Sequence, residues 1–199
     1  MTIRRALSFL TAMLAAFVLT GCFVVSQNLP TGAGPVGDPR LVGAWRGLDS
    51  DDGKDADAFL HFLKPDRDDP LRLVWVEDRN YQLYEVTTMV IAGKNVFAAK
   101  LIGPEEALKD GEVPTGYYLG FYEFVGENKV SFGLLDSEKV GELIAKGRVK
   151  GTRKPGKWEM ATLTGSSAEI AAFLASPDAQ AARMSDPATI RRLTPPLKP

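Results

Sequence analysis

Residues 115–136 read TGYYLGFYEFVGENKVSFGLLD, and this stretch indicates both the fold class and the way the fold is packed. Two runs rich in aromatic and β-branched residues flank Gly126-Glu127-Asn128, a composition typical of a hairpin turn between two strands. Successive side chains of a strand point to opposite faces. The faces of the first run carry Tyr117, Leu119 and Phe121 on one side, and Tyr118, Tyr122 and Phe124 on the other. Since both faces are apolar, we predict that this part of the sheet is covered on both sides.

The strand pattern continues along the chain in both directions from this hairpin. Further segments of similar composition, bounded by turn-forming residues, predict strands at 41–47, 57–64, 71–78, 81–93, 96–103 and 157–165. With the hairpin strands 115–126 and 129–136, the chain has about eight predicted strands. We therefore expect a mainly β (α+β) domain with an antiparallel, strongly bent sheet or barrel.

Two or three helices are predicted in the C-terminal half, where they can cover the second face of the sheet. The segment 136–147 places Val140, Leu143 and Ile144 on one stripe and ends at Gly147. In 166–176, Ser166 and Glu169 have the spacing of a capping box at a helix start. Pro177 then stands at a favourable first position for a third helix, while ATIRRL (188–193) fits either a short strand or a helical turn.

The N-terminal region has the features of an export signal. Arg4 and Arg5 precede an uncharged apolar stretch, 6–19, that is short for a membrane span. It ends in Leu19-Thr20-Gly21-Cys22, which contains the chain's only cysteine and resembles the lipobox of bacterial lipoproteins. The resemblance implies cleavage before Cys22, a diacylglyceryl group on its thiol, and acylation of the new amino terminus. Because Phe23 rather than Asp follows the cysteine, the resemblance also implies the outer membrane.

The chain divides into four predicted segments. Residues 1–21 form the lipoprotein signal peptide, and residues 22–40, dense in Gly and Pro, form a lipidated flexible tether. A globular β-rich domain follows at 41–193, and residues 194–199 form a Pro-rich tail. A mature body without cysteine has no disulfides.

Gly43-Ala44-Trp45, on the first predicted strand of the body, resembles the Gly-x-Trp motif of lipocalins. The resemblance implies an eight-stranded barrel with Trp45 at its base, beside an arginine from near the chain end, either Arg191 or Arg192. The predicted helices depart from that family, whose main helix follows the eighth strand. The later part of the body also resembles small uncharacterised bacterial lipoproteins, a resemblance that implies no function.

Few residues in the body are suited to catalysis or to metal binding. His61 is the only histidine, so a zinc site, which needs three or four ligands, is not expected. The acidic run at 49–57 departs from the calcium-loop pattern at three ligand positions. In TGSSAE (164–169), Glu169 stands where a nucleophile elbow needs its second glycine, and no phosphate-binding glycine loop is present. A net charge of −1 does not favour nucleic acid. We expect no cofactor, no metal and no enzymatic activity.

Two residue sets are candidates for binding. An aromatic set could line a pocket for an apolar ligand, and it comprises Trp45, Trp75, Tyr117 and Phe121. A basic run without acids, 147–157, could contact anionic surfaces through Arg148, Lys150, Arg153, Lys154 and Lys157. The first function hypothesis is therefore an envelope lipoprotein with a binding or structural role facing the periplasm, with a protein partner. The alternative is a lipocalin-like carrier of a small apolar ligand. The oligomeric state stays open.

Overall fold

The computed structural model describes residues 24–49, 53–64, 69–77, 80–104, 115–154 and 160–193. The predicted signal peptide, Cys22, Lys157 and the predicted tail lie outside the described residues.

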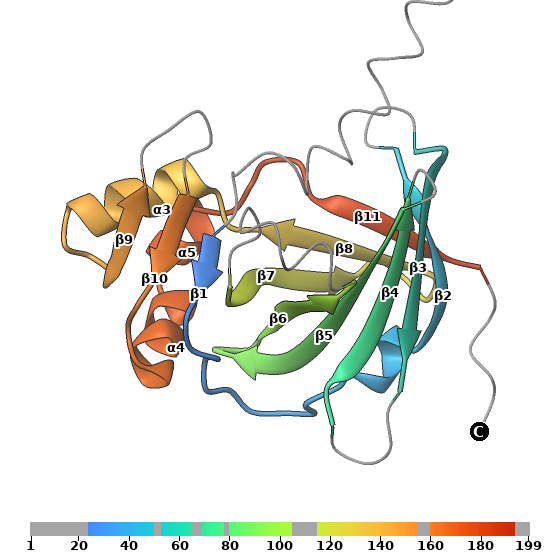
Figure 1. The fold of residues 1–199 in the computed structure, drawn as a ribbon, viewed down its shortest axis with the longest axis horizontal. Coiled ribbons are helices and arrows are strands. Elements are labelled where there is room, and N and C mark those ends of the chain that lie inside the picture. Colours follow the sequence, from blue (N-terminus) through green and yellow to red (C-terminus); the bar gives the residue numbers. More distant parts are fainter. Residues whose placement is uncertain are drawn as a thin grey trace, which may run out of the picture.

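The main body is a closed antiparallel barrel (Figure 1). Seven strands follow one another as an up-and-down meander: β2 (Gly43–Leu48), β3 (Asp55–Leu63), β4 (Leu71–Glu77), β5 (Asn80–Ile91), β6 (Lys94–Gly103), β7 (Tyr117–Phe124) and β8 (Lys129–Leu134). β11 (Ala188–Arg192) pairs with β8 on one side and with β2 on the other, and so closes the barrel. The predicted mainly β fold class is confirmed, and within the described residues the closed form is a barrel of eight strands.

The eighth barrel strand is not the one that local composition predicts. The predicted strand at 157–165 contains β10 (Met160–Leu163), which belongs to a small sheet beside the barrel. There it lies between β1 (Val24–Ser26), which runs parallel to it, and β9 (Gly151–Lys154). β1 also pairs antiparallel with the first residues of β7, so the small sheet continues from the barrel wall. Strand propensity indicates that a segment extends, but not which neighbour it pairs with.

The flexible tether predicted over 22–40 is wrong for its described residues, 24–40. Val24 and Val25 are buried in β1. Farther along, the backbones of Ala33 and Val90 bond to each other, and Thr88 N–H donates to the carbonyl of Val36. The segment ends in a short 3₁₀ helix, η1 (Pro39–Leu41), at the base of the barrel. Its backbone polar groups find partners on β5, which a Gly/Pro-rich composition does not reveal.

Three helices lie between β8 and β11, close to the predicted bounds. α3 (Ser137–Ala145) begins after Asp136, whose carboxylate accepts from the backbone N–H groups of Glu138 and Lys139. α4 (Ser167–Ala175) has the predicted capping box, and α5 (Pro177–Ala181) begins at Pro177. In the parts of the chain that the structure describes, no helix has the length and apolar character needed to cross a membrane.

The barrel wall separates two apolar cores, as the apolar faces of the 115–124 strand predict. Tyr122 lies inside the barrel, whereas Leu119 and Phe121 point outward into a second core with the small sheet and the helices. All three side chains are buried. Figure 1 shows the helices and the small sheet together at one side of the barrel. The helices therefore cover the outer face of β7, and the predicted double coverage is confirmed.

Candidate functional site

The base of the barrel is closed by Trp45 and Arg192. The Trp45 ring is fully buried, and its Nε1–H donates to the carbonyl of Leu41 at 2.7 Å. The Arg192 guanidinium lies 4.1 Å from the ring centroid, a cation–π contact. It donates from Nη1 to the Val42 carbonyl at 2.8 Å and from Nη2 to the Arg40 carbonyl. Arg192 thus holds the end of η1 against the tryptophan.

The structure decides between the two arginines that the lipocalin resemblance left open. Arg191 points outward and pairs with Asp55 at 2.8 Å, so Arg192 is the partner of Trp45. Gly43 is required beside this contact for two reasons. Its φ of +126° is a backbone conformation that side chains disfavour, and a Cβ there would lie 3.0 Å from Arg192 Nη1.

A buried carboxylate also stabilises the base of the barrel. Asp38 is 2% exposed and accepts from Arg40 through both oxygens, with Nε–Oδ1 at 3.0 Å and Nη2–Oδ2 at 2.7 Å. The Tyr122 hydroxyl donates to Oδ2 at 2.9 Å, which ties η1 to β7. Burial alone would raise the pKa of Asp38, but the hydrogen bonds from Arg40 and Tyr122 outweigh it and lower the pKa. This network is structural, because its oxygens are already committed.

Aromatic rings meet across the middle of the barrel. Phe132 on β8 stacks on Phe62 of β3 at 6.4 Å between centroids and meets Phe97 of β6 edge-on at 5.5 Å. Neither β3 nor β6 pairs with β8, so these contacts cross the interior. Tyr122 stacks on the same Phe132 ring at 6.0 Å. Side chains therefore occupy this level of the barrel, as an eight-stranded barrel allows.

The four residues predicted as one aromatic pocket do not converge. Trp45 and Trp75 belong to the interior core, whereas Tyr117 and Phe121 belong to the outer core on the other side of the barrel wall. The prediction is wrong because Tyr117 and Phe121 have the opposite parity to the interior residues of β7. The Nε1–H of Trp75 is buried and has no hydrogen-bond partner.

The fold also changes the charge environment that the sequence suggests for the basic run 147–157. The run contains no acid in sequence, but acids from other elements face its first half. Arg148 pairs with Asp178 of α5 at 2.7 Å, and Lys150 pairs with Glu169 of α4 at 2.6 Å. Arg153 and Lys154 lie on the edge strand β9 and are exposed. The interpretation of five unopposed cations is therefore wrong for Arg148 and Lys150.

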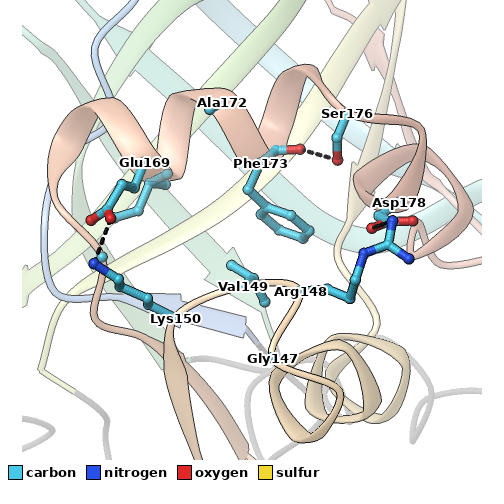
Figure 2. A pocket seen from close by; sticks show the side chains of 11 residues that line it. Gly147, Arg148, Val149, Lys150, Glu169, Ala172, Phe173, Ser176 and Asp178 are labelled. Carbon is cyan, nitrogen blue, oxygen red and sulfur yellow. Dashed lines mark hydrogen bonds and ion pairs between the residues drawn. The ribbon is translucent and has the colours of Figure 1, made fainter.

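These two ion pairs lie at the ends of a groove between α4 and the 147–150 segment (Figure 2). The groove has a volume of about 470 Å³. Val149 and Phe173 face each other in its middle, and Ala172 lies on the α4 side. The Phe173 ring belongs to the outer core and forms an apolar floor. The result is an apolar centre between two charged ends, which we call the α4 groove.

Sequence reasoning missed most of the α4 groove. Glu169 was identified through its capping box, which the structure confirms, but not as the partner of Lys150. Asp178 is thirty residues from Arg148, so no local spacing connects them. Phe173 is one of the three buried residues of α4. The groove exists only because the 147–150 segment, α4 and the start of α5 come together in the fold.

Glu169 gives the groove a pH dependence that can be measured. The Lys150 ammonium first, and then hydrogen bonds from Ser166, lower the pKa of Glu169 from 4.5 to about 2. A lowered pKa in the folded state stabilises the protein above the unfolded pKa, and this stabilisation is lost as pH falls through the folded value. We therefore expect Glu169→Gln to lose less stability than the wild type between pH 4.5 and 2, measured by urea unfolding.

Lys150→Met is the matched variant for this prediction. Removing the ammonium removes the largest cause of the shift, so the pKa of Glu169 should return toward its ordinary value and the acid loss should shrink. If the free energy of unfolding falls with pH to the same extent in the wild type and in both variants, the acid loss does not come from the Lys150–Glu169 pair.

The described residues form no metal site, and no known protein matches the chain. His61 is exposed on the outer face of β3. Within the described ranges, no three His, Cys, Asp or Glu side chains gather in a way that could hold a metal ion. Comparison with known proteins finds no matching family model, no similar curated protein and no similar solved structure.

Proposed function

We propose that this protein is a lipid-anchored, non-enzymatic component of the bacterial outer membrane that binds a segment of an envelope protein in the α4 groove, facing the periplasm. The observation that carries the binding role is the geometry of the groove, in which an apolar floor lies between two ion pairs. The anchor rests on the lipobox resemblance of Leu19-Thr20-Gly21-Cys22.

The α4 groove has the anatomy of a small protein-binding site. Binding surfaces combine an apolar centre with a polar, solvent-accessible rim. Phe173 and Val149 supply the centre, and the side chains of Arg148 and Lys150 are 62% and 71% exposed at the two ends. Each exposed pair contributes little to stability, so a partner's charges can replace one member at small cost. The fitting segment carries an apolar side chain between charged ones.

The aromatic contacts inside the barrel favour surface binding over transport of a ligand. Phe132, Phe62 and Phe97 already occupy the middle level of the interior. A partner that binds the outer α4 groove needs no displacement of these rings.

The binding role can be tested in living cells with a photoreactive amino acid at Ala172, which is exposed in the groove. We expect a discrete crosslinked protein, and we expect Arg148→Glu to reduce its yield roughly tenfold, as the loss of about 1.4 kcal/mol of binding energy would. Lys129→Glu, an exposed charge reversal on β8, is the matched control and should leave the yield unchanged. The same crosslinked protein from a probe at Tyr81, an exposed residue near the start of β5, would contradict groove binding.

The anchor has its own readout in the same strain. Wild-type protein should incorporate labelled palmitate and fractionate with outer membranes, and Cys22→Ser should do neither. Incorporation of palmitate by the Cys22→Ser protein would disprove the anchor.

A carrier role is a second candidate, and one observation favours it. The buried Nε1 of Trp75, on the inner face of β4, lacks an acceptor. Leaving such a donor unpaired costs about 1–3 kcal/mol, which a ligand with a hydrogen-bond acceptor would recover. A small apolar carbonyl compound should therefore shift the tryptophan fluorescence of the wild type, and Trp75→Phe should abolish that shift.

A further inference from the structure

The point at which the chain enters the fold lies beside two cations. Val24, the first described residue, pairs with Ala161 of β10, and Ala161 pairs with Arg153 of β9. Met160, one residue before Ala161 on β10, pairs with Lys154. In Figure 1, the start of β1 lies at the same end of the small sheet as the start of β10 and the end of β9. We call this the entry end of the small sheet.

The distance from Cys22 to the entry end is very short. Only Phe23 separates Cys22 from Val24, and two extended residues span at most about 7 Å. Val24 is 2% exposed and held between β10 and the outer core, so it cannot lengthen the connection without leaving the sheet. A tether of eighteen flexible residues would instead allow roughly 20–25 Å. A lipid on Cys22 therefore brings the entry end next to the bilayer surface.

The charges at the entry end suit an anionic surface. Lys154 and Arg153 are exposed on the edge strand. The start of α3 lies beside them, because Ser137 Oγ accepts from the Ala161 N–H at 2.9 Å. Its acid Asp136 is engaged in capping α3 and lies 3.8 Å from Lys139, while Glu138 is exposed. Lysine and arginine near a membrane surface are attracted by anionic headgroups.

The α4 groove opens from the opposite end of the small sheet. β9 begins there at Gly151, directly after Lys150, and β10 ends there at Leu163. The backbone bond from Thr164 N–H to the Lys150 carbonyl joins the two at the groove.

We propose that the protein sits directly on the membrane, with the entry end of the small sheet, including Arg153 and Lys154, against anionic phospholipid headgroups and the α4 groove directed away from the bilayer. This orientation rests on the proposed lipid anchor at Cys22. It leaves the groove open to a partner in the periplasm without any flexible linker.

The test uses the full lipidated chain in vesicles of phosphatidylcholine and phosphatidylglycerol that contain a nitroxide-labelled headgroup. A fluorophore is attached in Lys154→Cys at the entry end, and in the control Lys146→Cys, whose exposed side chain lies at the far end of α3. We expect the probe at 154 to lose most of its fluorescence by quenching and the probe at 146 to lose none. Equal quenching at both positions would overturn the orientation.

A second arm tests the charges. With the fluorophore in Thr152→Cys, Lys154→Glu should reduce quenching in anionic vesicles, whereas Lys146→Glu should leave it unchanged. Quenching that is insensitive to Lys154→Glu and to phosphatidylglycerol would overturn the headgroup contact. The mass of the N-terminal peptide from the same sample separates the two proposals. An unmodified Cys22 refutes the anchor and this orientation with it, whereas a lipidated Cys22 with equal quenching refutes the orientation alone.

Discussion

Replacing Trp45 by alanine is expected to destabilise the protein by about 4 kcal/mol, since aromatic-to-alanine changes in cores cost about 3–5 kcal/mol. The side chain is fully buried, so the change leaves a cavity at the base of the barrel. It also removes the donor that satisfies the Leu41 carbonyl and the ring on which the Arg192 guanidinium lies. Urea unfolding of the purified chain measures the loss.

Trp45→Phe separates packing from hydrogen bonding at this site. It keeps an aromatic ring under Arg192 but removes the Nε1–H, so we expect a smaller loss of about 1–2 kcal/mol. A loss below 1 kcal/mol for Trp45→Ala, outside the range for a buried aromatic, would show that Trp45 does not hold the base closed.

Asp38→Ala is expected to cost about 3 kcal/mol, because hydrogen bonds to charged groups contribute about 1.5–3 kcal/mol and a buried donor is left unpaired. The Tyr122 hydroxyl loses its acceptor inside the barrel, and Arg40 loses a two-point contact. Because the pKa of Asp38 is lowered in the folded state, its contribution is present above the pKa of an unfolded aspartate. It is lost as pH falls through the lowered value.

Asp178→Ala is the matched control for Asp38→Ala. Asp178 also pairs with an arginine at 2.7 Å, but on the surface, where such pairs contribute about 0–1 kcal/mol. Urea unfolding at neutral pH and at pH 3 compares the two variants. Equal losses for both at neutral pH would contradict the role assigned to the buried carboxylate.

The contacts at the base of the barrel hold the N-terminal segment, which leads from the proposed anchor, in a fixed position. η1 and the segment before it run from the small sheet to the barrel floor, where Asp38 and Arg192 hold them. The small sheet and the barrel are thereby one packed unit, and the proposed lipid anchor would attach to it through Cys22. In the proposed orientation, a partner at the α4 groove would bind a body whose position relative to the membrane is defined.

Several features could be predicted from local sequence because their causes are local. The alternation in 115–124 shows two apolar faces, which implies cover on both sides, and the Ser166–Glu169 spacing implies a helix start. The resemblance of Gly43-Ala44-Trp45 also led to an arginine partner near the chain end, although it left Arg191 and Arg192 as alternatives.

The errors arose where the partner of a segment is distant in sequence. Residues 24–40 lack a periodic pattern, but their backbone pairs with β5 and Val24 belongs to the outer core. Arg148 and Lys150 have no acid nearby in sequence, but α4 and α5 bring Glu169 and Asp178 to them. Tyr117 and Phe121 are aromatic like Trp45, but strand parity places them on the other side of the barrel wall.

The sequence by itself determined seven of the eight barrel strands, the three helices, the apolar faces and the presence of Cys22 in a lipobox-like leader, because these depend on residues within a few positions of one another. Only the tertiary structure decided which strand closes the barrel, where the α4 groove forms, and that Val24–Ser26 form a buried strand. Those features depend on pairings between residues far apart in the chain, which composition and spacing do not encode. The closeness in sequence of Cys22 to a buried strand, β1, therefore became evident only from the fold.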